Sequence, residues 1–120
     1  MEYGVDKVGI PVAEFEREAG EAARLLKAMA NERRLLVLCH LAVAGEISVG
    51  ELTDRVGLSQ SALSQHLARL RAERLVATRK SAQSVFYRVC DPKAQQVLAL
   101  LHDLFCPELG RESSSQSHRI

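Results

Sequence analysis

The stretch from Ser59 to Arg71 combines short hydroxyl and amide side chains with arginine in a helical pattern. Leu63, Leu67 and Leu70 recur at helical spacing, which places them on one face of a helix. The polar residues lie mostly on the other faces, and they include Gln60, Ser61, Ser64, Gln65 and Arg69. Side chains of these types hydrogen-bond to phosphates and to base edges in the major groove of DNA. The pattern therefore predicts a DNA-recognition helix.

The three cysteines are the second group of residues that could do chemistry. In a reducing cytosol they are better explained as small buried residues, metal ligands or reactive thiols than as a disulfide framework. Cys39 lies in an apolar run, where a cysteine is ordinarily a small buried residue, and Cys106 closes an apolar helix just before Pro107. Cys90 precedes that helix, and sixteen residues at about 1.5 Å each put it roughly 24 Å from Cys106. We therefore interpret Cys90 as a structural or incidental cysteine.

Length and hydropathy indicate one small domain that does not associate with a membrane. A chain of 120 residues can bury one modest core. The apolar runs are too short to cross a bilayer, and the acidic start lacks the basic-then-apolar layout of a secretory signal. We expect a cytoplasmic protein.

The charge is unevenly distributed along the chain. Residues 58–90 contain six basic residues and one acidic residue, a formal charge of +5. The net charge of the chain is +1, which leaves −4 for the rest. Such asymmetry is typical of a nucleic-acid-binding face on an otherwise acidic protein, although a solvated basic surface would look the same.

Two helices are expected before the helix-turn-helix. Residues 1–12 show no sustained period and indicate a flexible N-terminal arm. Apolar residues at helical spacing predict an amphipathic helix over 13–30. Asn31 is a candidate N-cap for a second helix, whose apolar run over 35–44 should be buried over much of its surface and should end at Gly45.

The next two helices form a helix-turn-helix pattern. Ser48 and Glu51 have the spacing of a capping box and open a short helix that Gly57 closes. Ser59 then caps the recognition helix. Two short helices joined at a glycine, the second with a polar outer face, are typical of this motif.

After Arg74 the hydrophobic period changes from helical to alternating. Residues 75–79 and 84–89 are predicted strands, with 80–83 as their connection, and together they form the β-hairpin called a wing. Asp91 caps a last helix that has Pro92 at its first position and ends near Cys106. Residues 107–120 are expected to be a flexible tail. The predicted fold is mainly α with a small β-hairpin, a winged helix-turn-helix domain over 13–106.

The first and last helices carry more apolar surface than a small winged core needs. We therefore expect a homodimer through these helices. A two-fold dimer would place two recognition helices about one DNA turn apart, as binding to a near-palindromic double-stranded operator requires.

Four segments of the sequence resemble the ArsR/SmtB family of winged-helix repressors. They are LKAMANERRL at 26–35, SVGEL at 48–52, LSQSALSQHL at 58–67 and VFY at 85–87. The resemblance covers about residues 22–106. Two positions depart from the family pattern: Arg74 stands where a glycine is usual, and the wing tip at 81–83 lacks the glycine often found there.

Within the family, the sequence is most similar to the branch of HlyU, BigR and SqrR, whose members sense persulfides and related oxidants through two cysteines. In that branch one cysteine lies in the second helix and one near the end of the last helix, positions that Cys39 and Cys106 match. The resemblance implies a repressor whose reduced dimer binds operator DNA. Reactive sulfur species or oxidants would be the inducer, by linking the two thiols directly or through a longer sulfur chain.

The resemblance and the helical spacing together assign expected DNA contacts. Base-edge or groove contacts are expected from the first two turns of the recognition helix, at Gln60, Ser61, Ser64 and Gln65. Phosphate or minor-groove contacts are expected from Arg69, Arg79, Lys80 and Gln83. Ser59 is expected only to cap its helix.

Two alternatives remain open. Residues 51–55 lack the Cys-x-Cys element of many metal sensors of the family, and the last helix offers only one histidine beside an aspartate, so no metal site or other cofactor is expected. A repressor that binds trivalent arsenic or another soft metal through thiolates, with Cys90 taking part, is one alternative. A thiol oxidoreductase is weaker, since the adjacent Cys39 and His40 are its only support and point about 100° apart. We therefore do not expect an enzyme.

Overall fold

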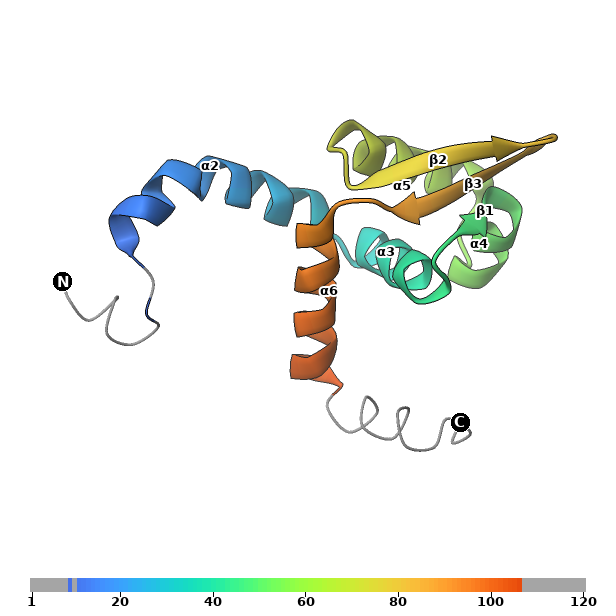
Figure 1. Ribbon diagram of the computed structural model, residues 1–120. Helices are drawn as coiled ribbons and strands as arrows, with labels where there is room; N and C mark the ends of the chain where they lie inside the picture. Colours follow the sequence, from blue (N-terminus) through green and yellow to red (C-terminus); the bar gives the residue numbers. More distant parts are fainter. Residues whose placement is uncertain (1–8, 10, 107–120) are drawn as a thin grey trace.

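The computed structural model describes residue 9 and residues 11–106. The tail predicted at 107–120 and nearly all of the arm predicted at 1–12 lie outside the described residues, except that Val12 is already helical. The described chain contains five helices and three strands (Figure 1), in the order α2 Val12–Met29, α3 Glu32–Ala44, β1 Ile47–Ser48, α4 Val49–Val56, α5 Gln60–Ala72, β2 Val76–Ser81, β3 Ser84–Val89 and α6 Pro92–Phe105. The predicted fold class is confirmed. None of the described helices combines the length and hydropathy that crossing a membrane requires.

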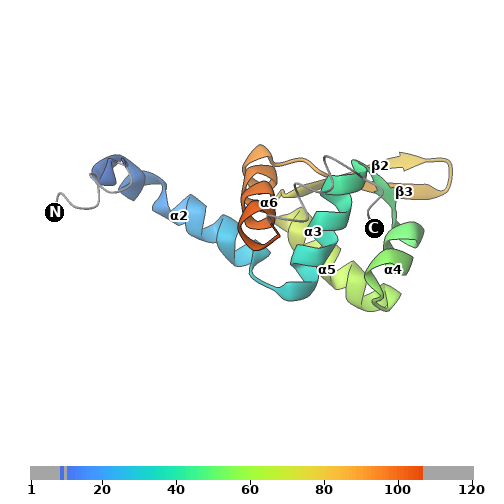
Figure 2. The same ribbon diagram turned by 90° about the horizontal axis from the view of Figure 1, so that it is seen from below.

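The boundary between α2 and α3 is fixed by two polar side chains. The Asn31 side chain accepts a hydrogen bond from the Arg34 backbone N–H at 3.0 Å, so the predicted N-cap is confirmed. The Arg34 guanidinium turns back and donates to the Ala28 carbonyl at 2.6 Å and to the Lys27 carbonyl at 3.4 Å. It therefore satisfies carbonyls at the end of α2 that have no helical partner. Figures 1 and 2 show that α2 extends away from the other elements while α6 lies beside α3.

The core lies where α3, α4, α5 and the sheet meet. Its largest fully buried side chains come from all four of these parts: Val37, Leu38, Leu41, Ile47, Leu52, Leu63, Leu70 and Leu75. Each buried leucine or isoleucine contributes roughly 1.5–3 kcal/mol relative to an exposed one. The three leucines predicted to anchor the recognition helix, Leu63, Leu67 and Leu70, are all buried, so this face of α5 is fixed by packing.

The expectation that α3 is buried over much of its surface is wrong for its outer face. Val37, Leu38 and Leu41 are buried, but Leu36 is 40% exposed and Val43 is 86% exposed. Among the described residues, no neighbour buries these two side chains. Apolar composition alone does not show which face of a helix has a neighbour.

The sheet has three antiparallel strands in the order β1-β3-β2. β1 was not predicted, because two residues are too few to show an alternating period; it pairs Ile47 with Tyr87 and Ser48 with Phe86. The predicted connection over 80–83 is too long. Ser81 pairs with Ser84 in the β2–β3 ladder, which places Lys80 and Ser81 in β2 and leaves two residues in the turn.

The two departures from the family pattern both occupy backbone positions that favour glycine. Arg74 has φ 64 and Ala82, in the wing turn, has φ 57. The Arg74 N–H bonds to the Arg71 carbonyl at 2.9 Å and the Leu75 N–H to the Leu70 carbonyl at 2.9 Å. This is the Schellman arrangement that ends many helices, with arginine in the left-handed position where glycine is usual.

Candidate nucleic-acid interface and thiol pair

The recognition helix presents its predicted polar face to solvent. The Ser59 hydroxyl accepts a hydrogen bond from the Ala62 N–H at 3.1 Å, which starts α5 and confirms the predicted cap. The four residues expected to contact base edges, Gln60, Ser61, Ser64 and Gln65, are all exposed in the first two turns. The buried leucines hold the opposite face, so the helix is both anchored and free to enter a groove.

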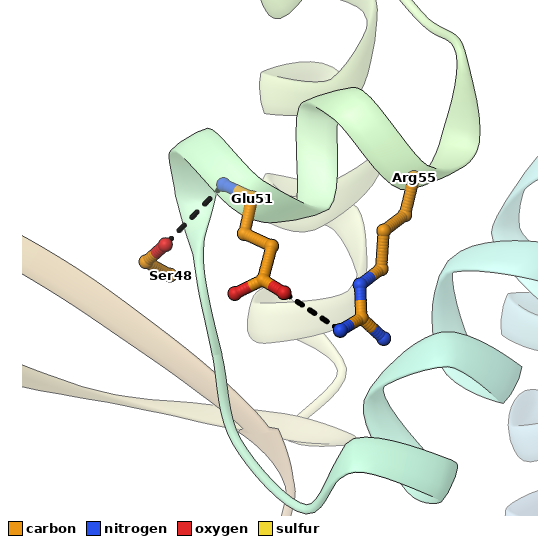
Figure 3. Close-up of polar contacts among 3 residues, drawn as sticks. All are labelled: Ser48, Glu51 and Arg55. Atoms are coloured by element: carbon orange, nitrogen blue, oxygen red, sulfur yellow. Dashed lines mark hydrogen bonds and ion pairs between the residues drawn. The ribbon is translucent and has the colours of Figure 1, made fainter.

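The preceding helix, α4, has a side-chain cap at its start and a left-handed glycine at its end (Figure 3). The Ser48 hydroxyl accepts from the Glu51 N–H at 3.3 Å, and the Glu51 carboxylate forms an ion pair with Arg55 at 2.6 Å. The serine half of the predicted capping box is therefore confirmed, while the glutamate pairs along its own helix. Gly57 ends α4 with φ 69, a left-handed value that suits glycine.

Arg69 lies apart from the four exposed residues of the first two turns of α5. It forms an ion pair with Glu73 at 3.9 Å, one helical turn further along. Partial burial, followed by the nearby charge of Arg69, lowers the pKa of Arg34. Arg69 is thus close to the start of α3, and it lines an open groove with residues of α2.

On the wing, Arg79 is held by a partner that the sequence did not indicate. Its Nε and one terminal nitrogen donate to the two carboxylate oxygens of Glu46 at 3.0 and 2.8 Å. Its guanidinium also lies 4.8 Å from the centre of the Phe86 ring. Lys80 and Gln83 are exposed, and Lys80 has no ion-pair partner within the described chain. The four predicted phosphate contacts therefore differ: Arg69 and Arg79 have protein partners, and Lys80 and Gln83 face solvent.

Cys39 and Cys106 are brought together by the packing of α3 against α6. Cys39 is exposed on α3, which contradicts the ordinary expectation of a small buried residue, and Cys106 is half-buried directly after α6. Loss of surrounding water, followed by the proximity of Cys106, raises the pKa of the Cys39 thiol. Cys90 lies at the other end of α6, where its thiol donates to the Arg74 carbonyl at 3.5 Å. The two thiols matched by the resemblance are thus neighbours, and the third is elsewhere.

Large apolar side chains remain exposed on α2, α3 and α6. They are Val12, Phe15 and Leu26 on α2, Leu36 and Val43 on α3, and Leu100, Leu104 and Phe105 on α6. Phe105 is 77% exposed and lies next to Cys106 in the chain. Within residues 11–106, no three His, Cys, Asp or Glu side chains gather closely enough to hold a metal ion.

Comparison with known proteins places these features in context. Residues 31–78 match the family model described as bacterial regulatory protein, arsR family. The chain is 56% identical over 93 residues to the transcriptional activator HlyU of Vibrio cholerae, covering 78% of this chain and 85% of that protein. It is 41% identical over 95 residues to the biofilm growth-associated repressor of Xylella fastidiosa, covering 79% of this chain and 82% of that protein.

Two solved structures of such proteins also match this chain in fold. The structure of reduced HlyU from Vibrio cholerae matches with a TM-score of 0.72 at 56% identity, covering 78% of this chain and 97% of that one. The transcriptional repressor BigR from Xylella fastidiosa matches with a TM-score of 0.76 at 40% identity, covering 81% of this chain and 98% of that one.

Proposed function

This chain belongs to the ArsR family of bacterial regulatory proteins, and from that premise we propose that it is a homodimeric repressor that releases operator DNA when Cys39 and Cys106 become linked through sulfur. The winged-helix fold and the relatives make it a DNA-binding transcriptional regulator. The direction of regulation, the dimer and the inducer are parts of the proposal.

The DNA-binding surface is α5 with the wing. Gln60, Ser61, Ser64 and Gln65 read base edges, because they are the exposed polar side chains nearest the start of a helix anchored on its other face. Lys80 and Gln83 contact the sugar-phosphate backbone from the wing, and Arg69 contacts a phosphate beside the C-terminal half of α5.

The dimer forms through α2 and α6, with the outer face of α3. Eight large apolar side chains are exposed on these three helices in one chain, and a second copy would cover them. A two-fold axis through this surface repeats α5 on the partner and so requires a near-palindromic operator.

The inducing chemistry is two successive displacements at sulfur. One cysteine thiolate attacks a sulfur atom of a polysulfide, forms a new S–S bond and expels a shorter polysulfide anion. The second cysteine thiolate then attacks the sulfur chain held by the first cysteine, and the outer end of that chain leaves as hydrosulfide or as a shorter polysulfide anion. Both thiols lose their protons, the two electrons leave with the expelled sulfur anions, and Cys39 and Cys106 end joined by a disulfide or a longer sulfur bridge.

The observation that carries this proposal is that α3, which contains Cys39, packs against α6, whose C-cap is Cys106. The raised pKa of Cys39, caused first by partial burial and then by the proximity of Cys106, agrees with this arrangement. A link there would join a helix packed on α5 to a helix of the proposed dimer surface. A change in the packing of α3 against α6 would alter the distance between the two recognition helices. Binding to two half-sites depends on that distance.

The test is operator binding by single-cysteine variants, followed by fluorescence anisotropy with and without polysulfide. Cys39→Ser and Cys106→Ser should bind DNA as the wild type does and should not release it on treatment. Cys90→Ser is the matched control and should still release it. Intact mass of the treated wild type should show a link within one chain, with any bridging sulfur counted by its added mass. Release of DNA by the Cys39→Ser/Cys106→Ser double variant, or release by arsenite but not by polysulfide, would contradict the proposal.

A further inference from the structure

The ion pair between Glu46 and Arg79 crosses the whole width of the sheet. Glu46 immediately precedes β1, Arg79 lies in β2, and the central strand β3 runs between them. Arg79 is the pairing partner of Phe86 in β3, and Ser48 of β1 is paired with the same Phe86 from the other side. The Arg79 side chain therefore passes over the Phe86 ring, at 4.8 Å from its centre, to reach the residue before β1.

The geometry of the contact is unusually well defined for a surface ion pair. The planar guanidinium gives two parallel N–H···O bonds, at 3.0 and 2.8 Å, to the two oxygens of one carboxylate. Such a bidentate pair fixes orientation as well as distance, and the aromatic ring adds a cation–π contact. The hydrogen bond from Arg79, together with its charge and that of Arg88, lowers the pKa of Glu46, so the carboxylate stays ionised at neutral pH.

Arg79 lies in the last row that β1 supports, whereas Glu46 comes just before the start of β1. β1 pairs only with Tyr87 and Phe86, so the wing beyond the Arg79–Phe86 row is a ribbon of two strands. Lys80 and Gln83 both lie in that two-stranded part. An isolated two-stranded ribbon has little independent stability, and the angle at which it leaves the sheet depends on its last supported row.

Arg79 and Lys80 are adjacent in β2 but differ in their ability to contact a phosphate. Successive side chains of a strand point to opposite faces, so Arg79 and Lys80 are on different sides of the ribbon. Glu46 holds two of the five N–H groups of the Arg79 guanidinium, so a phosphate bound by the other three would lie beside the Glu46 carboxylate, and moving the guanidinium away would give up two charge-assisted hydrogen bonds. Lys80 is exposed and can contact a phosphate at no such cost.

We propose that Glu46 and Arg79 are positioning residues for DNA binding: clamped across Phe86, they set the direction of the two-stranded wing so that Lys80 reaches the DNA backbone, and Arg79 itself makes no phosphate contact. This inference rests on the proposed DNA-binding function of the wing. It assigns a role to Glu46, an acidic residue that charge considerations alone would place away from DNA.

The first test compares Arg79→Gln with its matched control Lys80→Gln, since each removes one positive charge from the same strand. Affinity for a random-sequence duplex long enough for two half-sites is measured over a series of salt concentrations. Lys80→Gln should reduce the salt slope of log K by about 0.9 for each wing in contact, as loss of a phosphate contact does. Arg79→Gln should weaken binding by roughly two- to fivefold with the slope unchanged, because Lys80 still makes its phosphate contact in the complex but the wing, no longer held by the clamp, must first be ordered. A reduced slope for Arg79→Gln would overturn the proposal.

Glu46→Gln supplies the opposite charge change. Removing a negative charge near DNA should by itself tighten binding, whereas loss of the clamp should weaken it by about the same factor as Arg79→Gln. The Glu46→Gln/Arg79→Gln double variant should be no weaker than either single variant, because both remove one interaction. Tighter binding by Glu46→Gln would mean that Glu46 merely restrains a phosphate-binding arginine.

A measurement without DNA separates this inference from the proposed function. Amide hydrogen exchange in the free protein should be faster at residues 80–85 in Glu46→Gln and Arg79→Gln and unchanged in Lys80→Gln. If the wild type binds no DNA, the proposed function fails, and exchange still tests the clamp. Unchanged exchange in both clamp variants would refute the clamp even if DNA binding is normal.

Discussion

Two regions of the molecule differ in how far their apolar side chains are buried. At the end formed by α4 and α5, each helix starts at a serine cap, the apolar face is buried and the exposed face is polar. At the end formed by α2, α6 and the outer face of α3, large apolar side chains including Val43 and Phe105 are exposed. One chain alone therefore buries the apolar face of its helix-turn-helix. It leaves apolar side chains exposed on α2, α3 and α6, where a second copy is proposed to bind.

The largest expected effect is at the end formed by α4 and α5. Leu63→Ala removes a fully buried side chain from the helix-turn-helix core and should lower the free energy of unfolding by about 2–5 kcal/mol, measured by urea denaturation. Ser64→Ala, at the exposed neighbouring position, is the control and should change it by less than about 0.5 kcal/mol. Similar losses for the two variants would mean that α5 is not anchored by this face.

The next largest effect is expected on the exposed apolar surface of α6, in the stability of the proposed dimer. Phe105→Ser removes an aromatic side chain that is 77% exposed in one chain. If it is central to the dimer, the free energy of dimer dissociation should fall by about 2 kcal/mol, measured by sedimentation over a dilution series. Gln96→Ser, an exposed polar position on the same helix, should leave it unchanged. A dimer that is insensitive to Phe105→Ser would place the interface elsewhere.

A smaller effect is expected from the cap of the recognition helix. Ser59→Ala leaves the Ala62 N–H without its acceptor and should cost about 1 kcal/mol of unfolding free energy. Ser59→Asp, which can also accept that hydrogen bond, should keep most of the stability. Thermal unfolding followed by circular dichroism measures both, and equal losses would show that the cap does not stabilise α5.

Arg74→Gly should act in the stabilising direction. Arg74 has φ 64 at the end of α5, a conformation that glycine adopts without steric cost, so the free energy of unfolding should rise by about 0.5–1 kcal/mol. Arg71→Gly, inside the helix, is the matched control and should lower it by about 1 kcal/mol. A loss of stability in Arg74→Gly would indicate that the arginine side chain makes a compensating contact.

The smallest effect concerns pH at the thiol pair. Because partial burial and then Cys106 raise the pKa of Cys39, its thiol is more fully protonated at neutral pH than an ordinary cysteine. Alkylation of Cys39 should accelerate as pH rises through the alkaline range, and its midpoint should be lower in Cys106→Ser, as followed by peptide mass spectrometry. The same shift means that the folded state loses a little stability as pH rises through that range. An identical midpoint with and without Cys106 would show that the two thiols are not neighbours.

Local chemistry explains what could be predicted from the sequence. The caps at Asn31, Ser48, Ser59 and Asp91 were predicted because a cap depends only on residues two or three positions away, and all four side chains accept the expected kind of hydrogen bond. The buried face of α5 was predicted because helical spacing defines it. The DNA-contact residues remain predictions, although their exposure is consistent with the role.

Features that depend on distant partners could not be predicted. β1 is two residues long and exists only through its pairing with Phe86 and Tyr87. Glu46 and Arg79 are separated by 33 residues, so their ion pair depends on a strand that the sequence did not reveal. The exposure of Cys39 was missed for the same reason, because an apolar run does not show which of its faces lacks a neighbour.

The strand order β1-β3-β2 has a consequence for solubility. It places β2 at an edge, where a six-residue strand offers unpaired backbone groups to any other extended chain. Lys80 lies on that edge, and burying its charge against a second sheet would be unfavourable. The same cationic side chain that is proposed to reach the DNA backbone therefore also protects the wing from edge-to-edge aggregation while no DNA is bound.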